Sequence, residues 1–214
     1  PYPDQLGAWP YGLPELHREE LRGAGRVAVP GCYPTAALLA LAPLVAAGLV
    51  ATDGIVVDAK SGLSGAGRSL TDANLFVQAN ENVTPYKVGG RHRHTPEIEQ
   101  ELALAAGKPV TVTFTPHLVP ATRGILATCY ATLAPSAGDE ELAACYRAAY
   151  AGEPFVDLLE PSKSWPATRA VATTNRVQVA AAADRRAGKV VAAAAIDNLV
   201  KGAAGQAVQC ANLA

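Results

Sequence analysis

Five segments of this chain of 214 residues have the composition or the apolar spacing of helices. The second begins at Cys32, is dense in alanine and leucine, and is expected to end at Gly48. In the third, we expect Thr95 to cap the helix, with Pro96 at its first position and Gly107 after its last turn. The five predicted helices are residues 14–21, 32–48, 96–106, 139–150 and 200–213.

Six other segments are rich in β-branched and small apolar residues and are bounded by glycine, proline or polar residues, which predicts strands. Several follow one another without an intervening helix. This order favours an α+β fold, with a mixed, largely antiparallel sheet and helices on one face, over a doubly wound parallel sheet. Residues 69–91 lack a clear period and are expected to be mostly loop. The predicted strands are residues 26–30, 54–62, 110–120, 123–133, 167–184 and 188–199.

Composition narrows the class of protein. Half of the residues are hydrophobic, which is enough for a core without disulfides, and the net charge is only −1. No block of like charges indicates nucleic-acid or membrane binding, and the longest apolar run, 36–50, is interrupted by Pro43 and too short to span a bilayer. With no visible secretory signal and four well-separated cysteines, we expect free thiols in the cytoplasm.

Cys32 is the candidate nucleophile. It stands between a predicted strand and a predicted helix, flanked by Gly31 and Pro34. A thiol at the start of a helix faces unpaired N–H groups and the positive end of the helix dipole, so a depressed pKa is expected. Most single cysteines are merely small buried side chains, however, and the local sequence leaves both readings open. The other three, Cys129, Cys145 and Cys210, are assigned to structural roles.

A thiolate needs a proton partner, and two histidines flank Arg93 just before the third predicted helix. Residues two apart in an extended segment point to the same side, so His92 and His94 are both candidates, and the residues alone do not choose between them. A solvated polar loop is the alternative. No third ligand has a recognisable spacing, so a metal site is not expected.

Residues 60–68, KSGLSGAGR, form a glycine-rich loop with two hydroxyl groups and a guanidinium, from Ser61, Ser64 and Arg68. Such a loop lets backbone N–H groups approach an anion, but its glycine order matches neither the GxGxxG nor the Walker pattern. A plain turn between strands is the alternative. Taken together with the cysteine and the histidines, the loop suggests acyl transfer through a thioester, on an anionic or phosphorylated substrate.

Six motifs carry a family resemblance from about Trp9 to the C-terminus: PGCYPTAAL, SGLSGAGR, HRHTPEIEQEL, PHLVPATRGILAT, GEPFV and DNLVKGAAGQAVQ. In this order they resemble the N-acetyl-γ-glutamyl-phosphate reductases. The resemblance implies NADPH-dependent reduction of that acyl phosphate to N-acetylglutamate 5-semialdehyde and phosphate, in arginine biosynthesis. It also implies a catalytic domain like that of glyceraldehyde-3-phosphate dehydrogenase, and a homo-oligomer, either a dimer or a tetramer.

The resemblance also implies roles for individual residues. Cys32 would be the nucleophile, and His92 the acid/base. Asn198 would lie near the nicotinamide. The remaining candidates, for holding substrate carboxylate or phosphate, are Ser61, Ser64, Arg68, His94 and Lys201.

The chain departs from the family pattern because it has no glycine fingerprint of a nucleotide-binding domain. We therefore expect residues 1–31 to be the tail end of a Rossmann-type domain and residues 32–214 to be the catalytic and subunit-contact domain. A chain truncated in this way is expected to bind NADPH weakly and to turn over poorly alone. The alternatives are a reductase of a related acyl phosphate, either carrier-linked aminoadipyl phosphate or aspartyl phosphate, and a non-catalytic oligomerisation module.

Overall fold

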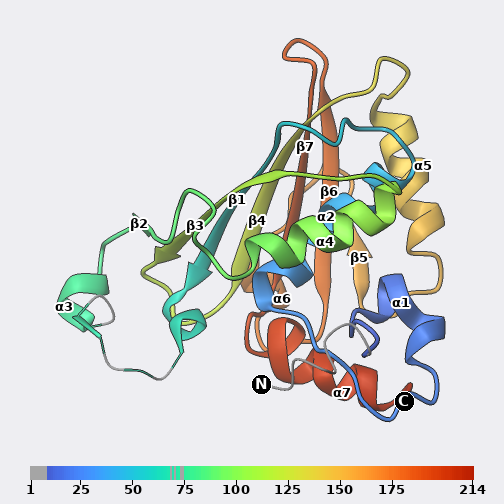
Figure 1. Cartoon of the computed structure of the whole chain (residues 1–214). Helices are drawn as coiled ribbons and strands as arrows, with labels where there is room; N and C mark the ends of the chain where they lie inside the picture. Colours follow the sequence, from blue (N-terminus) through green and yellow to red (C-terminus); the bar gives the residue numbers. More distant parts are fainter. Residues whose placement is uncertain (1–8, 68, 70, 73–74) are drawn as a thin grey trace.

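The computed structural model describes residues 9–67, 69, 71–72 and 75–214. Its centre is a seven-stranded sheet with the order β2-β3-β1-β4-β7-β6-β5 (Figure 1). The β1–β3 and β5–β6 pairs are parallel and the other four neighbouring pairs are antiparallel. The predicted mixed and largely antiparallel sheet is thereby confirmed. The strands are β1 Ile55–Gly62, β2 Thr84–Pro85, β3 Val112–Val119, β4 Ile125–Thr132, β5 Val156–Leu158, β6 Val177–Asp184 and β7 Lys189–Ile196.

Strand formation follows from alternating burial. In β1, Val57 and Ala59 are fully buried, and the residues between them are half-exposed. Strand β4 repeats this pattern, with Ala127 and Cys129 fully buried. Because successive side chains of a strand point to opposite faces, these residues place the core on one face of the sheet. The other face is more open.

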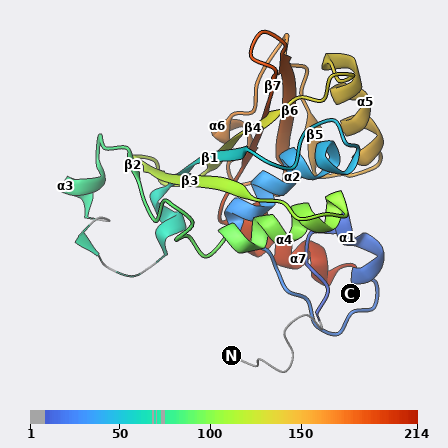
Figure 2. The ribbon, with the colours of Figure 1, turned by 45° about the horizontal axis from the view of Figure 1, so that its top comes forward.

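One helix fills most of that core. Helix α2, Cys32–Ala46, is apolar on all sides, and its residues from Tyr33 to Val45 are buried. It packs against β4, β6 and β7, and helix α4, Thr95–Ala106, lies beside it on the same face of the sheet (Figures 1 and 2). A helix without a polar face is stable only when it is surrounded by protein, as this one is.

Pro43 lies inside α2 without ending it. Proline has no N–H to donate to the carbonyl four residues earlier, here that of Leu39. The hydroxyl of Tyr150 donates to this carbonyl at 2.5 Å. A side chain just beyond helix α5, Asp139–Ala149, therefore satisfies the backbone group that the proline leaves unpaired.

The smaller elements lie around the ends of α2 and the edges of the sheet. Helix α3 and β2 extend away from the body as an arm in both views (Figures 1 and 2). A short 3₁₀ helix continues β1, and a π-helical turn runs directly into α7. These elements are α1 Pro14–Leu21, the 3₁₀ helix Leu63–Ala66, α3 Phe76–Ala79, α6 Thr168–Val171, the π-helix Val200–Ala204 and α7 Gly205–Ala211.

Three local predictions are wrong. Residues 26–30 form no strand, only one bridge between Ala28 and Tyr11. The first part of the predicted strand 167–184 is helix α6, which follows a proline. Helix α4 includes Thr95, and the residue before it takes the capping position without a side-chain hydrogen bond. In each case tertiary packing overrides a weak local preference.

The N-terminal segment packs into the same body as the rest of the chain. Leu13 belongs to the main hydrophobic core, and α1 contacts α7. The proposed division at residue 31 stays a prediction. Within the described residues, the helices are all too short or too polar to cross a bilayer.

Candidate active site

Cys32 is the first residue of α2, and Gly31 is its extended N-cap. The predicted position at a helix start is confirmed. Backbone N–H groups of Cys32 and Tyr33 lower the pKa of the thiol, but burial raises the pKa more, so it lies above its ordinary value. The expectation of a depressed pKa is therefore wrong for this structure, because desolvation outweighs the helix N-terminus.

The thiol lines a cleft of about 450 Å³ that is formed by four separate parts of the chain. One wall is the turn before α2, and the facing wall is the π-helix and the start of α7. The 3₁₀ helix and the segment before α4 complete the cleft. Its polar lining residues are Cys32, Ser64, Arg93, His94 and Asn198.

The π-helix touches Cys32 directly. A methyl group built on Gly202 would lie 2.7 Å from Cβ of Cys32, closer than real contacts allow. Glycine at this position therefore lets the π-helix approach the thiol. π-Helical turns are rare in proteins overall, and those that occur are often found at functional sites.

Gly202→Ala is expected to push the π-helix and Cys32 apart, because neither Cβ atom can rotate away. We predict that the alkylation rate of Cys32 by iodoacetamide changes by at least about threefold, since the exposure of the sulfur and its N–H partners change together. Mass spectrometry of the Cys32 peptide measures this rate. An unchanged alkylation rate in a folded Gly202→Ala variant would show that the contact between Gly202 and Cys32 does not determine the position of the thiol.

His94 lies against the turn that presents the thiol. Its Nε2 would be 2.3 Å from a methyl group built on Gly31, so the ring packs flat on that glycine. Burial, followed by electrostatic coupling to His92 and by the positive charge of Arg93, lowers the pKa of His94 to about 4. Its Nδ1 is buried, and no described residue forms a hydrogen bond with it. His94 is therefore a neutral imidazole at the cleft.

His92 lies behind His94 rather than on the cleft wall. Its ring makes edge contacts with Tyr33, Tyr86 and Phe114, with centroids 5.2–5.6 Å apart. Its Nδ1 accepts a hydrogen bond from the backbone N–H of His94 at 3.1 Å. Burial, then nearby positive charges, lowers its pKa to about 4. The choice of His92 as the acid/base stays a prediction.

The polar loop residues have different surroundings. Ser64 accepts a hydrogen bond from Nδ2 of Asn198 at 3.0 Å, and Oδ1 of Asn198 accepts one from the N–H of Gly124 at 2.6 Å. Asn198 and Ser64 therefore form one fixed polar corner of the cleft. Ser61, in contrast, is fully buried and donates to the carbonyl of Gly62. Arg68 lies outside the described residues.

Lys201 does not line the cleft. Its ammonium is fully buried, 2.5 Å from Oε1 of Glu15 and 2.8 Å from Oε1 of Gln209. The family resemblance implied a place near substrate. Because successive side chains of a helix point in different directions around its axis, Lys201 points inward while Gly202 faces Cys32. Its contacts indicate a structural ion pair.

Arg93 is a cleft residue that the sequence analysis passed over. It is exposed, it lines the cleft, and its charge lowers the pKa of Cys32. Its place between two candidate histidines was the signal that could have identified it. A guanidinium beside the thiol is suited to a carboxylate or a phosphate.

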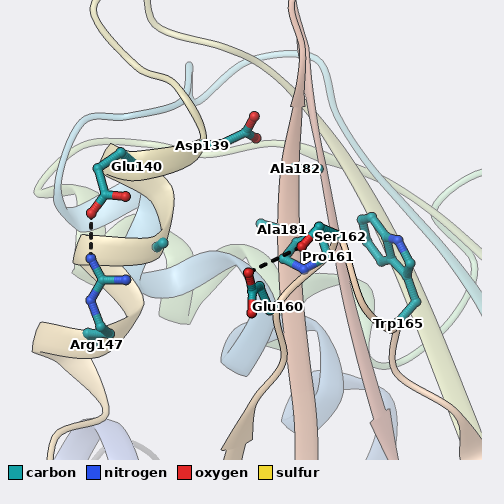
Figure 3. A pocket seen from close by; sticks show the side chains of 10 residues that line it. Asp139, Glu140, Arg147, Glu160, Pro161, Ser162, Trp165, Ala181 and Ala182 are labelled. Atoms are coloured by element: carbon teal, nitrogen blue, oxygen red, sulfur yellow. Dashed lines mark hydrogen bonds and ion pairs between the residues drawn. The ribbon is translucent and has the colours of Figure 1, made fainter.

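A second cavity, of about 540 Å³, lies between α5 and β6 and shares no lining residue with the cleft. Figure 3 shows two pairs among its polar side chains, Arg147 donating to Glu140 and Ser162 to Glu160. Asp139 accepts a hydrogen bond from the backbone N–H of Ala183. It contains no nucleophilic thiol or histidine, and its carboxylates already have partners. Nowhere in the described residues do three or more His, Cys, Asp or Glu side chains gather as a metal site.

Comparison with known proteins bears on this site. Residues 32–198 match the family model described as semialdehyde dehydrogenase, dimerisation domain. The N-acetyl-gamma-glutamyl-phosphate reductase of Moorella thermoacetica is 59% identical over 203 residues, covering 95% of this chain and 58% of that protein. The protein of the same name from Micrococcus luteus is 54% identical over 210 residues, covering 97% and 60%. The chain thus spans about 60% of the length of these curated relatives.

Solved structures agree on the fold. Aspartate semialdehyde dehydrogenase II from Vibrio cholerae, complexed with ASA, matches with a TM-score of 0.75 at 19% identity, over 99% of this chain and 70% of that chain. The enzyme from Francisella tularensis matches with a TM-score of 0.72 at 16% identity, over 97% and 71%. The resemblance carried by the six motifs is confirmed. The chain belongs to the semialdehyde dehydrogenase family, and its residues 32–198 correspond to the dimerisation domain of that family.

Proposed function

We propose that this chain is the catalytic part of an NADPH-dependent reductase that converts N-acetyl-γ-glutamyl phosphate to N-acetylglutamate 5-semialdehyde and phosphate. The observation that carries the proposal is Cys32 at the start of α2, in one cleft with His94, Arg93 and Asn198. The identity of 54–59% to reductases of that name supports the choice of substrate.

In the first step the Cys32 sulfur attacks the acyl carbonyl, its proton passes to an imidazole, and the C–O bond to phosphate breaks. A thioester and inorganic phosphate result. Because the thiol is un-ionised at neutral pH, it needs this base, and both histidines are neutral. Nδ1 of His94 has no hydrogen-bond partner among the described residues, whereas Nδ1 of His92 accepts from the N–H of His94, so that hydrogen bond must open before Nδ1 of His92 takes up the proton. The N–H groups at the start of α2 are placed to hold the oxyanion.

Hydride addition to the thioester would give the alkoxide of a thiohemiacetal. As this alkoxide collapses to the aldehyde, the C–S bond breaks and the imidazolium returns its proton to the sulfur. In this scheme His92 is the acid/base, with His94 between it and the cleft. Arg93 and Ser64 hold substrate oxygens at the cleft wall, and Arg68 is a further candidate outside the described residues.

The nicotinamide of NADPH supplies the hydride when it is bound. The cleft fits a flat ring, because Gly202, Ala203 and Ala204 line one wall with small side chains. Asn198 stands at the edge of that wall, and its amide is fixed by Gly124 and Ser64. These residues would orient the ring over Cys32 and exclude water from the thioester.

A second copy of the chain is the proposed macromolecular partner, as a dimer or a tetramer, because the matched family domain is a dimerisation domain. The open face of the sheet, opposite α2, is the proposed contact surface. It carries Tyr130, which is 38% exposed, and the half-exposed Val56 and Leu126.

All four cysteines are free, as expected for a cytoplasmic enzyme.

The proposal is tested in the reverse direction, with an enzyme that combines this chain with a nucleotide-binding domain. We expect NADP reduction with N-acetylglutamate 5-semialdehyde and phosphate, and a rate at least about a hundredfold lower with aspartate semialdehyde or a carrier-linked aminoadipate semialdehyde. A preference for either rival aldehyde would contradict the proposed substrate. No turnover with any of them, together with alkylation of Cys32 no faster than that of Cys145, would indicate a non-catalytic oligomerisation module.

A further inference from the structure

Glu97, in the first turn of α4, holds the backbone that presents the thiol. Its Oε1 accepts a hydrogen bond from the N–H of Gly31 and another from the hydroxyl of Tyr11, both at 2.8 Å. Gly31 is the N-cap of α2 and directly precedes Cys32. One carboxylate oxygen therefore joins the N-terminal segment, the catalytic turn and α4.

The Gly31 turn is constrained on every side. Its N–H is held by Glu97, and its Cα is covered by the ring of His94, which leaves no room for a methyl group. Its carbonyl accepts from the N–H and the hydroxyl of Thr35, at 3.0 and 3.1 Å, which starts the helix. The position of the Cys32 sulfur follows from this turn, because only one backbone unit separates them.

The Glu97 carboxylate is partly buried, and burial disfavours its charged form. Burial raises the pKa of Glu97, against the lowering effect of its hydrogen bonds to Gly31 and Tyr11. Burial and Glu97 together raise the pKa of Tyr11, so the phenol remains a donor. A charged group kept at such a site contributes little net stability, which points to a role in function.

The charge of Glu97 also acts on the thiol. The groups that face it are Tyr11, Arg93, His94, Glu101 and Cys32, from the N-terminal loop, α4 with its leading segment, and α2. Burial has the largest effect on the pKa of the Cys32 thiol; Arg93 lowers this pKa and Glu97 raises it, both by smaller amounts. Arg93 and Glu97 are four residues apart in the sequence, and their charges have opposite effects on the pKa of the thiol.

We propose that Glu97 is a positioning residue for the reaction at Cys32, which fixes the Gly31 turn through its carboxylate. This inference rests on the proposed role of Cys32 as the nucleophile. It gives a structural role to Glu97, the glutamate that ends the HRHTPE motif.

The test compares Glu97→Gln, Glu97→Ala and the control Glu99→Gln in the full chain. Glu99 lies on the same helix and also accepts a backbone N–H, that of Val112 at 3.0 Å, but its charge is not among those that act on Cys32. Two quantities are measured: the iodoacetamide alkylation rate of Cys32 from about pH 6 to pH 10, and amide hydrogen exchange of the Gly31–Cys32 segment.

Glutamine keeps the acceptor oxygen and removes the charge, so the thiolate is favoured and the alkylation profile shifts to lower pH. We expect a rate increase of about two- to fivefold near pH 7.5, reduced somewhat because a less basic thiolate is a weaker nucleophile. Alanine also removes the acceptor, and exchange of the Gly31 amide is expected to accelerate at least about tenfold. Glu99→Gln should match the wild-type chain in both measurements.

Matching profiles for Glu97→Gln and Glu99→Gln would overturn the role of the charge, and unchanged exchange in Glu97→Ala would overturn the positioning. If Glu97→Ala does not fold, Tyr11→Phe replaces it, since it frees the carboxylate from one of its two donors and is expected to increase the exchange rate measurably. None of these measurements needs substrate or cofactor, so a wrong proposed substrate would leave their outcome unaffected.

Discussion

Cys32→Ser is expected to reduce acyl-phosphate reduction by at least about a thousandfold, without loss of the fold. A serine hydroxyl is a much weaker nucleophile than a thiol and would form an ordinary ester, which resists reduction by hydride. The side chain is close in size, and it lies at a cleft rather than in the core. The steady-state rate of NADP reduction in the reverse direction measures the loss, in an enzyme containing this chain and a nucleotide-binding domain.

Cys145→Ser is the matched control. Its thiol is half-buried on α5 and donates to the carbonyl of Pro43, a contact that a serine hydroxyl can replace. We expect its activity to stay within about twofold of the wild-type value, because surface and half-buried substitutions have small effects. Activity above about a tenth in Cys32→Ser would contradict a covalent mechanism at this residue.

Lys201→Met is expected to be the most destabilising single change at the buried polar cluster. Both Lys201 and Glu15 are fully buried, and their charges lie 2.5 Å apart. Removing Lys201 leaves the buried Glu15 carboxylate without a charged partner and with only the amide of Gln209, at 2.9 Å, as a donor, which costs about 3–5 kcal/mol of unfolding free energy. For a chain of this size that corresponds to a fall in melting temperature of roughly 10 °C. Urea unfolding at neutral pH measures the loss.

Two further variants make this result specific. Lys163→Met removes an ion pair of the same 2.5 Å length at the surface, where the side chains of Lys163 and Glu160 are 76% and 59% exposed, and no measurable change is expected. The double variant Lys201→Met with Glu15→Gln removes both buried charges and should recover much of the stability. Equal losses for Lys201→Met and Lys163→Met would show that the buried pair does not contribute.

The Lys201 pair also has a consequence for the site. Lys201 and Gly202 are neighbours in the π-helix, and Gly202 contacts Cys32 while Lys201 is tied to the N-terminal segment. Tyr11 is tied through Glu97 to the turn on the other side of the thiol. Residues 11–15 thus support both walls of the cleft.

Local signals in the sequence were sufficient for much of the fold. The α2 segment is predicted by its alanine and leucine content and ends near Gly48, whose φ of +67° only glycine adopts readily. The hairpin of β6 and β7 is predicted by two apolar runs around Gly188, which has a φ of +63°. Strand order was not predictable, because β1 pairs with β3 and β4, far along the chain.

In the candidate site, too, some features were predictable from the local sequence and others depend on tertiary contacts. The position of Cys32 at a helix start is local, and the sequence identified it. Its raised pKa, the placing of His94 on Gly31 and the inward turn of Lys201 depend on elements that come together only on folding. Arg93 and Glu97 acquire their roles through contacts with residues more than 60 positions away.

By itself, then, the amino-acid sequence determined most of the helices and strands, the position of Cys32 at a helix start, and the family that the motifs resemble. Backbone preferences and apolar periods act over a few residues, so a sequence shows them directly. Only the tertiary structure decided the burial of each ionisable group, and with it the direction of each pKa shift. Desolvation depends on everything that surrounds a group, and those surroundings come from every part of the chain.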